Sequence, residues 1–254
     1  MSTARSDIQA QPEYRYLHTE REDRMTVRKL LATLKCDLER CKYRLKQPGI
    51  AIVLLFPGFQ ALAFYRIRRW LNTRSKARNP LWWPIIIMEA VAARFIEIIT
   101  GIYIDPDATI GPGLYMPHFG GIVIGERVVI GHNCDIHQGV TIGVGGRAPR
   151  GYPVVGDRAY IGAGAKVIGP IKIGDDVAIG ANAVVTKSIP DRAVAVGIPA
   201  RIISYEGSFE YIHYPGEGQD IDRIRSVSLC DVLAGDTGQD VATLSTSQDA
   251  DQIF

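Results

Sequence analysis

Aliphatic residues recur every six positions through the middle of the chain, over residues 104–190. The first residues of these hexads are Ile104, Ile110, Met116, Ile124, Ile130, Ile136, Ile142, Val155, Ile161, Val167, Ile173, Ile179 and Val185. Four places after the leading residue stands a second column of mostly small or branched residues, which includes Ala108, Cys134, Val140, Ala159, Ala165 and Ala183. Two insertions interrupt the count, one of Ile122 and Val123 and one around residues 148–154.

A period of six cannot be an α-helix, whose apolar positions recur at three and four, and it is too regular for antiparallel strands. It is typical of a parallel β-helix, in which each hexad supplies a strand and a corner and three hexads make a coil. We expect the aliphatic residue to point into the prism and the fourth-place residue to fill a tight corner. Glycine follows most leading residues, where little room or an unusual backbone angle favours it. The alternative is a β-rich solenoid used only for binding.

Before the hexads, apolar positions follow helical spacing, which predicts helices at 25–45, 57–72 and 79–100. The uncharged stretch 47–65 is broken by Pro57 and Gly58, and the stretch 81–100 contains three charged residues. We interpret both as buried helices, with contact with a membrane surface as the alternative. The predicted fold class is therefore α+β. Its segments are a polar arm (1–24), an α-helical domain (25–101), a β-helix domain (102–203) and an acidic, disordered tail (204–254).

Composition adds little to this picture. The 254 residues include 29 Lys and Arg against 27 Asp and Glu, with the acidic residues concentrated after residue 205. The basic body suits an anionic ligand, and no motif indicates nucleic-acid binding. The four cysteines have neither disulfide nor zinc spacing, and Cys134 falls in the small-residue column, as a packed side chain would. Because the first residues are polar and charged, no signal peptide is indicated and we expect a cytoplasmic protein.

From about residue 35 to 203 the chain resembles the serine acetyltransferases, a family of left-handed β-helix acyltransferases. The resemblance lies in PGFQALAFYR at 57–66, HFGGIVIGE at 118–126, HQGVTIG at 137–143, IGAGAKVIG at 161–169 and VGIPAR at 196–201. It implies a left-handed coil and acetyl-CoA as the acyl donor. It also implies homotrimers with active sites between subunits, in some cases joined as dimers of trimers.

Counting coils places His118, Gln138, Ala163 and Ala181 in one column, over about 14 Å of the helix axis. In the family, alanines matching Ala163 and Ala181 contact coenzyme A, and the histidine matching His118 is the catalytic base. We therefore expect His118 to take the proton of an acceptor hydroxyl that attacks the acetyl carbonyl. Backbone N–H groups near Gly143 are candidate donors to the oxyanion.

Other charged residues are weaker candidates. Lys187 and Arg201, with Lys166, are possible partners for the cofactor phosphates. His132 and His137 are expected on different faces, with His137 in surface or interface packing, so no histidine is expected to bind a metal.

Three positions depart from the family's pattern. Pro117 stands where an acidic residue usually precedes the catalytic histidine, Tyr152 where a second histidine is usual, and Tyr103 near the place of an orienting carboxylate. Asp105 is a weaker replacement, because we expect it to point away. The family uses these charged groups to hold an amino acid, whose ammonium and carboxylate need charged partners.

These departures favour an acetyl-CoA-dependent O-acetyltransferase whose acceptor is a saccharide or exopolysaccharide precursor. The alternatives are L-serine O-acetylation in cysteine biosynthesis and, in another class, a non-catalytic hexapeptide-repeat scaffold. Family members that bind cysteine synthase end in isoleucine, whereas this chain ends in Phe254, so we do not predict that complex.

Overall fold

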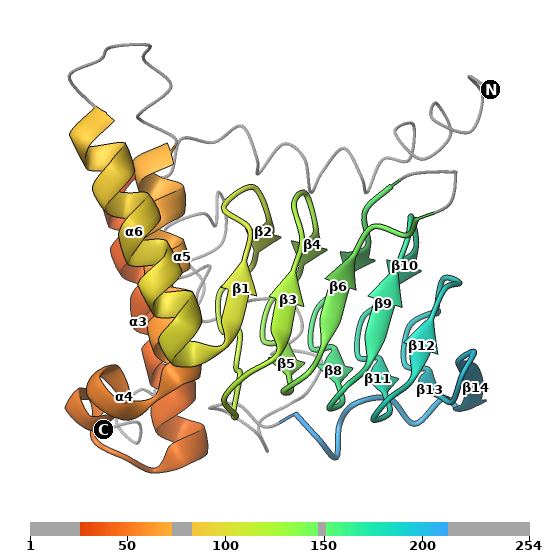
Figure 1. The fold of residues 1–254 in the computed structure, drawn as a ribbon. Helices are drawn as coiled ribbons and strands as arrows, with labels where there is room; N and C mark the ends of the chain where they lie inside the picture. Colours follow the sequence, from red (N-terminus) through yellow and green to blue (C-terminus); the bar gives the residue numbers. More distant parts are fainter. Residues whose placement is uncertain (1–25, 73–82, 147–150, 213–254) are drawn as a thin grey trace, which may run out of the picture.

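The computed structural model describes residues 26–72, 83–146 and 151–212. The predicted polar arm (1–24) and most of the predicted tail lie outside the described residues. Within the described ranges, a group of helices lies at one end of a stack of β-helix coils (Figure 1). The predicted fold class, a left-handed parallel β-helix preceded by α-helices, is confirmed.

The helices are α3 (Val27–Leu45), α4 (Gly49–Leu55), α5 (Pro57–Asn72) and α6 (Trp83–Thr100). Helix α3 begins where the Thr26 side chain accepts a hydrogen bond from the backbone N–H of Lys29, and it ends at Lys46, which is left-handed. The predicted helix 57–72 coincides with α5, whereas α4 was not among the predicted helices. Pro57 divides them, since it stands at the first position of α5, where its missing N–H costs no hydrogen bond.

Three parallel faces form the prism. The first holds β1 (Ile102–Ile104), β3 (Ile122–Ile124), β6 (Thr141–Gly143), β9 (Lys166–Ile168) and β12 (Val184–Val185). The second holds β2 (Thr109–Ile110), β4 (Val129–Ile130), β7 (Val154–Val155) and β10 (Lys172–Ile173). The third holds β5 (Asp135–Ile136), β8 (Tyr160–Ile161), β11 (Ala178–Ile179), β13 (Val194–Val196) and the antiparallel β14 (Arg201–Ser204).

The core of the prism is built from the two columns of the six-residue repeat. Every leading residue of the hexads is at most 7% exposed. The fourth-place residues Ala108, Val128, Cys134, Val140, Ala159, Ala165, Val177 and Ala183 are fully buried. Most of the glycines that follow the leading residues stand where a side chain would collide with the next coil. Gly131, for example, does not have a positive φ, and a Cβ there would lie 2.7 Å from the carbonyl carbon of Gly156.

Buried ion pairs join the helices to the coils. The Asp37 carboxylate of α3 accepts hydrogen bonds from Arg66 Nε (3.1 Å) on α5 and from the backbone N–H of Gly113 (2.7 Å) on the β-helix. Arg40 donates to Asp135 of β5, and both side chains are almost fully buried. The helical part is thus fixed to the first coils by groups that have no access to solvent.

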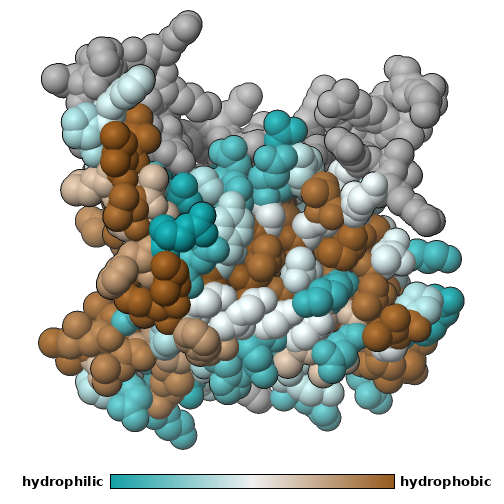
Figure 2. Space-filling view, in the orientation of Figure 1, coloured by the Kyte–Doolittle hydropathy of each residue, from teal (hydrophilic) through white to brown (hydrophobic). Residues whose placement is uncertain are grey.

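The exposure of α6 differs from the prediction of buried helices. Eight large apolar residues among those described in α6 are at least 45% exposed, including Trp83 (66%), Phe95 (62%) and Ile98 (70%). Together with Ile50, Leu54 and Leu55 of α4 they form apolar bands at the helical end of the molecule (Figure 2). Among the described residues, no single helix is long and apolar enough to cross a membrane, although α4 and α5 together, bent by 84°, pass the same test.

Two further details depart from the sequence-based expectation. The chain does not leave the β-helix at residue 204, because the Ser208 backbone N–H donates to the carbonyl of Asp176 (2.9 Å) and Ile212 is buried. Cys41 and Cys134 are free and buried, in agreement with packing for Cys134, whereas Cys36 is disulfide-bonded, which its spacing did not indicate.

Candidate functional site

His118 lies in the turn that leads from the third face of the prism to the first. Its side chain is exposed, while Met116, two residues earlier, is buried in the core. Helix α5 begins directly on this turn, with Gly58 against the Met116 carbonyl. Tyr115, at the start of the turn, stacks on Phe56 with ring centroids 5.9 Å apart and lies under the Arg44 guanidinium. The helices therefore brace the turn that presents His118.

The backbone register corrects the column derived from coil counting. The N–H of Gly139 donates to the carbonyl of Gly120 (3.1 Å), while the N–H of Gly164 donates to Gln138 (2.8 Å) and that of Asn182 to Ala163 (2.8 Å). The column is therefore Gly120, Gln138, Ala163 and Ala181.

His118 lies two residues ahead of that column. The strand Ile122–Ile124 is in regular register with Ile102–Ile104 of β1, so the two extra residues do not lie there. They lie between Met116 and Gly120, in the turn itself. The correction matters because it gives His118 a different neighbour.

The neighbour of His118 is His137, for which the sequence predicts only surface or interface packing. The two imidazole centroids are 5.9 Å apart and tilted by 50°. His137 also meets the ring of Tyr160 at 4.9 Å, and Tyr160 stacks on Tyr211 at 4.7 Å. Burial, and then the positive charges of His118 and Arg44, lower the pKa of His137. His137 is therefore a neutral imidazole at neutral pH, beside an exposed one.

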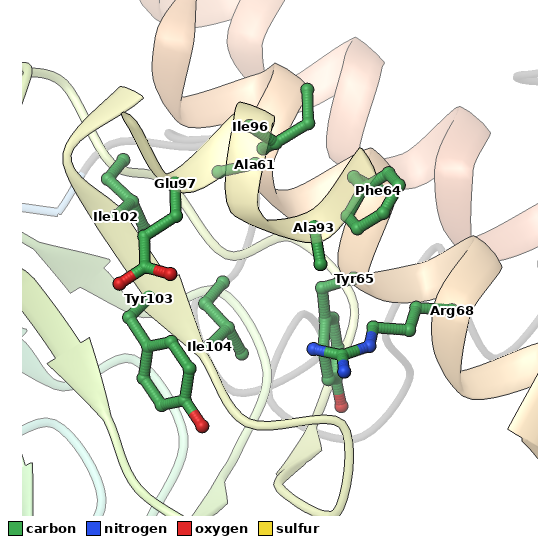
Figure 3. Close-up of a pocket in the computed structure, with 10 residues that line it drawn as sticks. All are labelled: Ala61, Phe64, Tyr65, Arg68, Ala93, Ile96, Glu97, Ile102, Tyr103 and Ile104. Carbon is green, nitrogen blue, oxygen red and sulfur yellow. The ribbon is translucent and has the colours of Figure 1, made fainter. Parts of the chain in front are cut away.

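Tyr103 faces the helices. Its hydroxyl donates to Asp105 Oδ2 (3.0 Å), so these two side chains lie on the same side, as residues two apart in a strand do. Burial, and then the hydrogen bond and charge of Asp105, raise the pKa of Tyr103. Together with Glu97 and Arg68, Tyr103 lines a cavity of about 40 Å³ between α5, α6 and β1 (Figure 3).

Tyr152 lies at a different corner of the chain from His118. Its hydroxyl donates to Glu126, and the Arg127 guanidinium lies 5.6 Å from its ring centroid. Both partners follow β3, whereas His118 precedes it. Within one chain, Tyr152 therefore does not stand where a second histidine could act with His118. Pro117, directly before His118, is partly buried and neutral.

The residues expected to contact coenzyme A lie on the surface. Ala163 is partly exposed and Ala181 exposed, one coil apart in the corrected column. Lys187 and Arg201 are exposed. Lys166 is less available, because its ammonium donates to the carbonyl of Gly139 and to Thr141 Oγ1. Gly143 ends β6, with open space where a side chain would begin, so its backbone is approachable.

Sequence reasoning missed His137, Tyr160 and Tyr211. His137 was interpreted as surface or interface packing, and the assignment of the extra residues to Ile122 and Val123 placed Gln138 in the column of His118. The glycines carried a usable signal, since Gly121, Gly139 and Gly164 pack directly on one another and would have set the register. Tyr211 had no such signal, because it lies beyond the repeats and reaches Tyr160 only through the return of the chain over the third face.

Known proteins resemble this chain in both sequence and structure. Two family models match it, the bacterial transferase hexapeptide (six repeats) at residues 152–187 and the hexapeptide repeat of succinyl-transferase at residues 121–145. The serine acetyltransferase of Mycobacterium tuberculosis is 40% identical over 180 residues, which are 68% of this chain and 73% of that protein.

Solved structures give the same picture. The serine acetyltransferase of Brucella abortus in complex with coenzyme A is 31% identical with a TM-score of 0.60, over 69% of this chain and 68% of that one. The soybean serine acetyltransferase complexed with serine is 32% identical with a TM-score of 0.61, over 69% of this chain and 70% of that one.

Proposed function

The chain belongs to the serine acetyltransferase family and is an acyltransferase, and on this premise we propose that it transfers the acetyl group of acetyl-CoA to the hydroxyl of L-serine. The observation that carries the proposal is the 40% identity over 180 residues to a serine acetyltransferase, in a chain that presents His118 on a braced turn. Related structures with coenzyme A and with serine support both substrates.

In the proposed mechanism His118 is the general base. Its imidazole takes the proton of the acceptor hydroxyl, whose oxygen attacks the thioester carbonyl. The tetrahedral intermediate then collapses, the C–S bond breaks, and the protonated imidazole returns the proton to the thiolate of coenzyme A. A backbone N–H near Gly143 is the proposed donor to the oxyanion.

We propose that the pantetheine arm of coenzyme A lies along the column of Ala163 and Ala181. Small side chains there leave a shallow surface that begins one coil from Gln138, the residue after His137. Lys187 and Arg201 are exposed cations that could meet the phosphates, and their contribution would be electrostatic and sensitive to salt.

The comparisons favour L-serine over the saccharide acceptor that the departures at Tyr103, Pro117 and Tyr152 had suggested. A sugar hydroxyl remains the second candidate because these three positions are neutral, and an amino acid's ammonium and carboxylate need charged partners. For an L-serine acceptor, those partners must come from elsewhere, and the family's trimeric assembly, with sites between subunits, is the arrangement that we propose to supply them.

The test is the release of coenzyme A thiol from acetyl-CoA on addition of L-serine, compared with sugar nucleotides and oligosaccharides. We expect turnover with L-serine. We expect His118→Ala to lower kcat by about 10²- to 10⁴-fold, the range for a general base, while coenzyme A binding in calorimetry is retained.

His132→Ala is the matched control. This histidine lies two hexads further along the chain and bonds Asp157 at 3.0 Å, so its loss should leave kcat unchanged. Turnover with a sugar acceptor alone would replace L-serine by the second candidate, and full activity in His118→Ala would contradict the catalytic assignment.

A further inference from the structure

His137 is held in a fixed place beside His118. Its backbone N–H donates to the carbonyl of Ile161 (3.1 Å), so the main chain is part of the ladder between coils. Its ring lies between the imidazole of His118 at 5.9 Å and the phenol of Tyr160 at 4.9 Å. A side chain packed in this way cannot turn freely away from His118.

The ring of His137 carries an unused polar atom. Nε2 is buried and has no hydrogen-bond partner among the described residues. An unsatisfied buried nitrogen costs on the order of 1–3 kcal/mol, so such atoms are rare unless a ligand, water or functional group completes them. Since burial lowers the pKa of His137, the ring stays neutral and keeps one nitrogen that can accept a hydrogen bond.

His118 needs such an acceptor. A histidine that acts as a base uses one nitrogen, and the hydrogen bond made by the other N–H sets the tautomer and the ring orientation. Tyr103, at the family's carboxylate position, donates a hydrogen bond to Asp105 and lines the cavity between α5, α6 and β1. The described contacts include no direct hydrogen bond between His118 and His137, and with ring centroids 5.9 Å apart a link between the two rings needs an intervening water.

We propose that His137 is the positioning residue of this site: its neutral imidazole accepts, through one bridging water, the N–H of His118 that does not act as the base. The inference rests on the proposed function, in which His118 is that base. His137 takes no proton from the substrate. It holds His118 in the reactive tautomer and stabilises the imidazolium that forms when the acceptor proton is taken.

Two variants and one control test the proposal. His137→Phe keeps a flat ring against Tyr160 and removes both nitrogens, whereas His137→Gln keeps an amide that can accept a hydrogen bond. Tyr160→Phe, the control, leaves the packing in place and removes only a hydroxyl from the next ring. All are compared for kcat, for KM of acetyl-CoA and for melting temperature.

We expect His137→Phe to lower kcat by about 10- to 100-fold, as when a partner that orients another imidazole is removed, with KM for acetyl-CoA within about twofold. His137→Gln should recover a substantial part of the loss, and Tyr160→Phe should match the wild type. Wild-type kcat in His137→Phe, or an equal loss in Tyr160→Phe, would overturn the proposal.

A second readout does not depend on turnover. In long-range ¹H–¹⁵N spectra of the ring nitrogens, His118 should show one dominant tautomer in the wild type and a mixture in His137→Phe. Unchanged His118 signals would overturn the positioning role. Failure of the wild type to acetylate any acceptor would instead refute the proposed function, so the two failures are distinguishable.

Discussion

Replacement of Gly58 by alanine should separate helix α5 from the turn that carries His118. A Cβ at Gly58 would overlap the carbonyl oxygen of Met116 and lie 3.0 Å from the Met116 Cβ. The obstacle is backbone, which cannot rotate away, so the helix or the turn must move. Overpacking of this kind costs about 1–3 kcal/mol, whereas the gain in helix propensity is at most about 1 kcal/mol. The steric term is therefore the larger one.

The expected result is a loss of stability together with a loss of activity. A net change of about 2 kcal/mol corresponds to a fall of about 4–8 °C in melting temperature for a chain of this size, measured at matched protein concentration. Displacement of His118 by part of an ångström should also lower kcat by about 10- to 100-fold.

Gly49→Ala is the matched control, because a Cβ there would make only ordinary contacts, at 3.6 Å from Leu38 and 3.8 Å from Lys42. A Gly58→Ala protein that melts with the control and keeps wild-type kcat would refute the packing argument.

Two further predictions concern buried groups. Asp135→Ala should lower the free energy of unfolding by about 3–5 kcal/mol in urea denaturation, because it leaves the buried Arg40 without its carboxylate. Glu39→Ala, which removes an exposed ion pair with Lys42, is the control and should cost less than about 1 kcal/mol. Equal losses in the two variants would contradict this reading. Burial raises the pKa of Cys41 and of Cys134 to about 12, so both thiols stay protonated well above the pH at which a free cysteine ionises. Neither should be alkylated by iodoacetamide at pH 8 before unfolding, as read by peptide mass spectrometry, and rapid labelling of the native protein would show that one of them is accessible.

The interior of the β-helix followed directly from the sequence. Each leading residue points inward because the strand geometry repeats with the hexad, so a local pattern is sufficient to identify the buried column from Ile104 to Val185. The same holds for the small corner residues, such as Cys134. Three helices at the N-terminal end were found by their periodicity, including the start of α5 at Pro57, but the short helix α4 was not, because its seven residues, GIAIVLL, carry no polar face.

The pattern of apolar residues could not predict which faces of the helices are exposed to solvent. The stretch that forms α6 is apolar on most sides, which is compatible with a buried helix as well as with one that presents an apolar face outward. Only its place at the end of the molecule, packed on α5 and β1 along one side, decides which residues face solvent (Figure 1).

The sequence by itself determined the repeat and the family and identified His118 as the proposed base, because each depends on residues close together along the chain. The tertiary structure alone decided what stands beside that base. Two extra residues between Met116 and Ile124 can be placed before or after Gly120 without any change in the six-residue count, yet only the hydrogen bonds between coils fix the choice. With the extra residues in the turn, His118 meets His137 rather than Gln138, and the contact depends on a register that no single hexad contains.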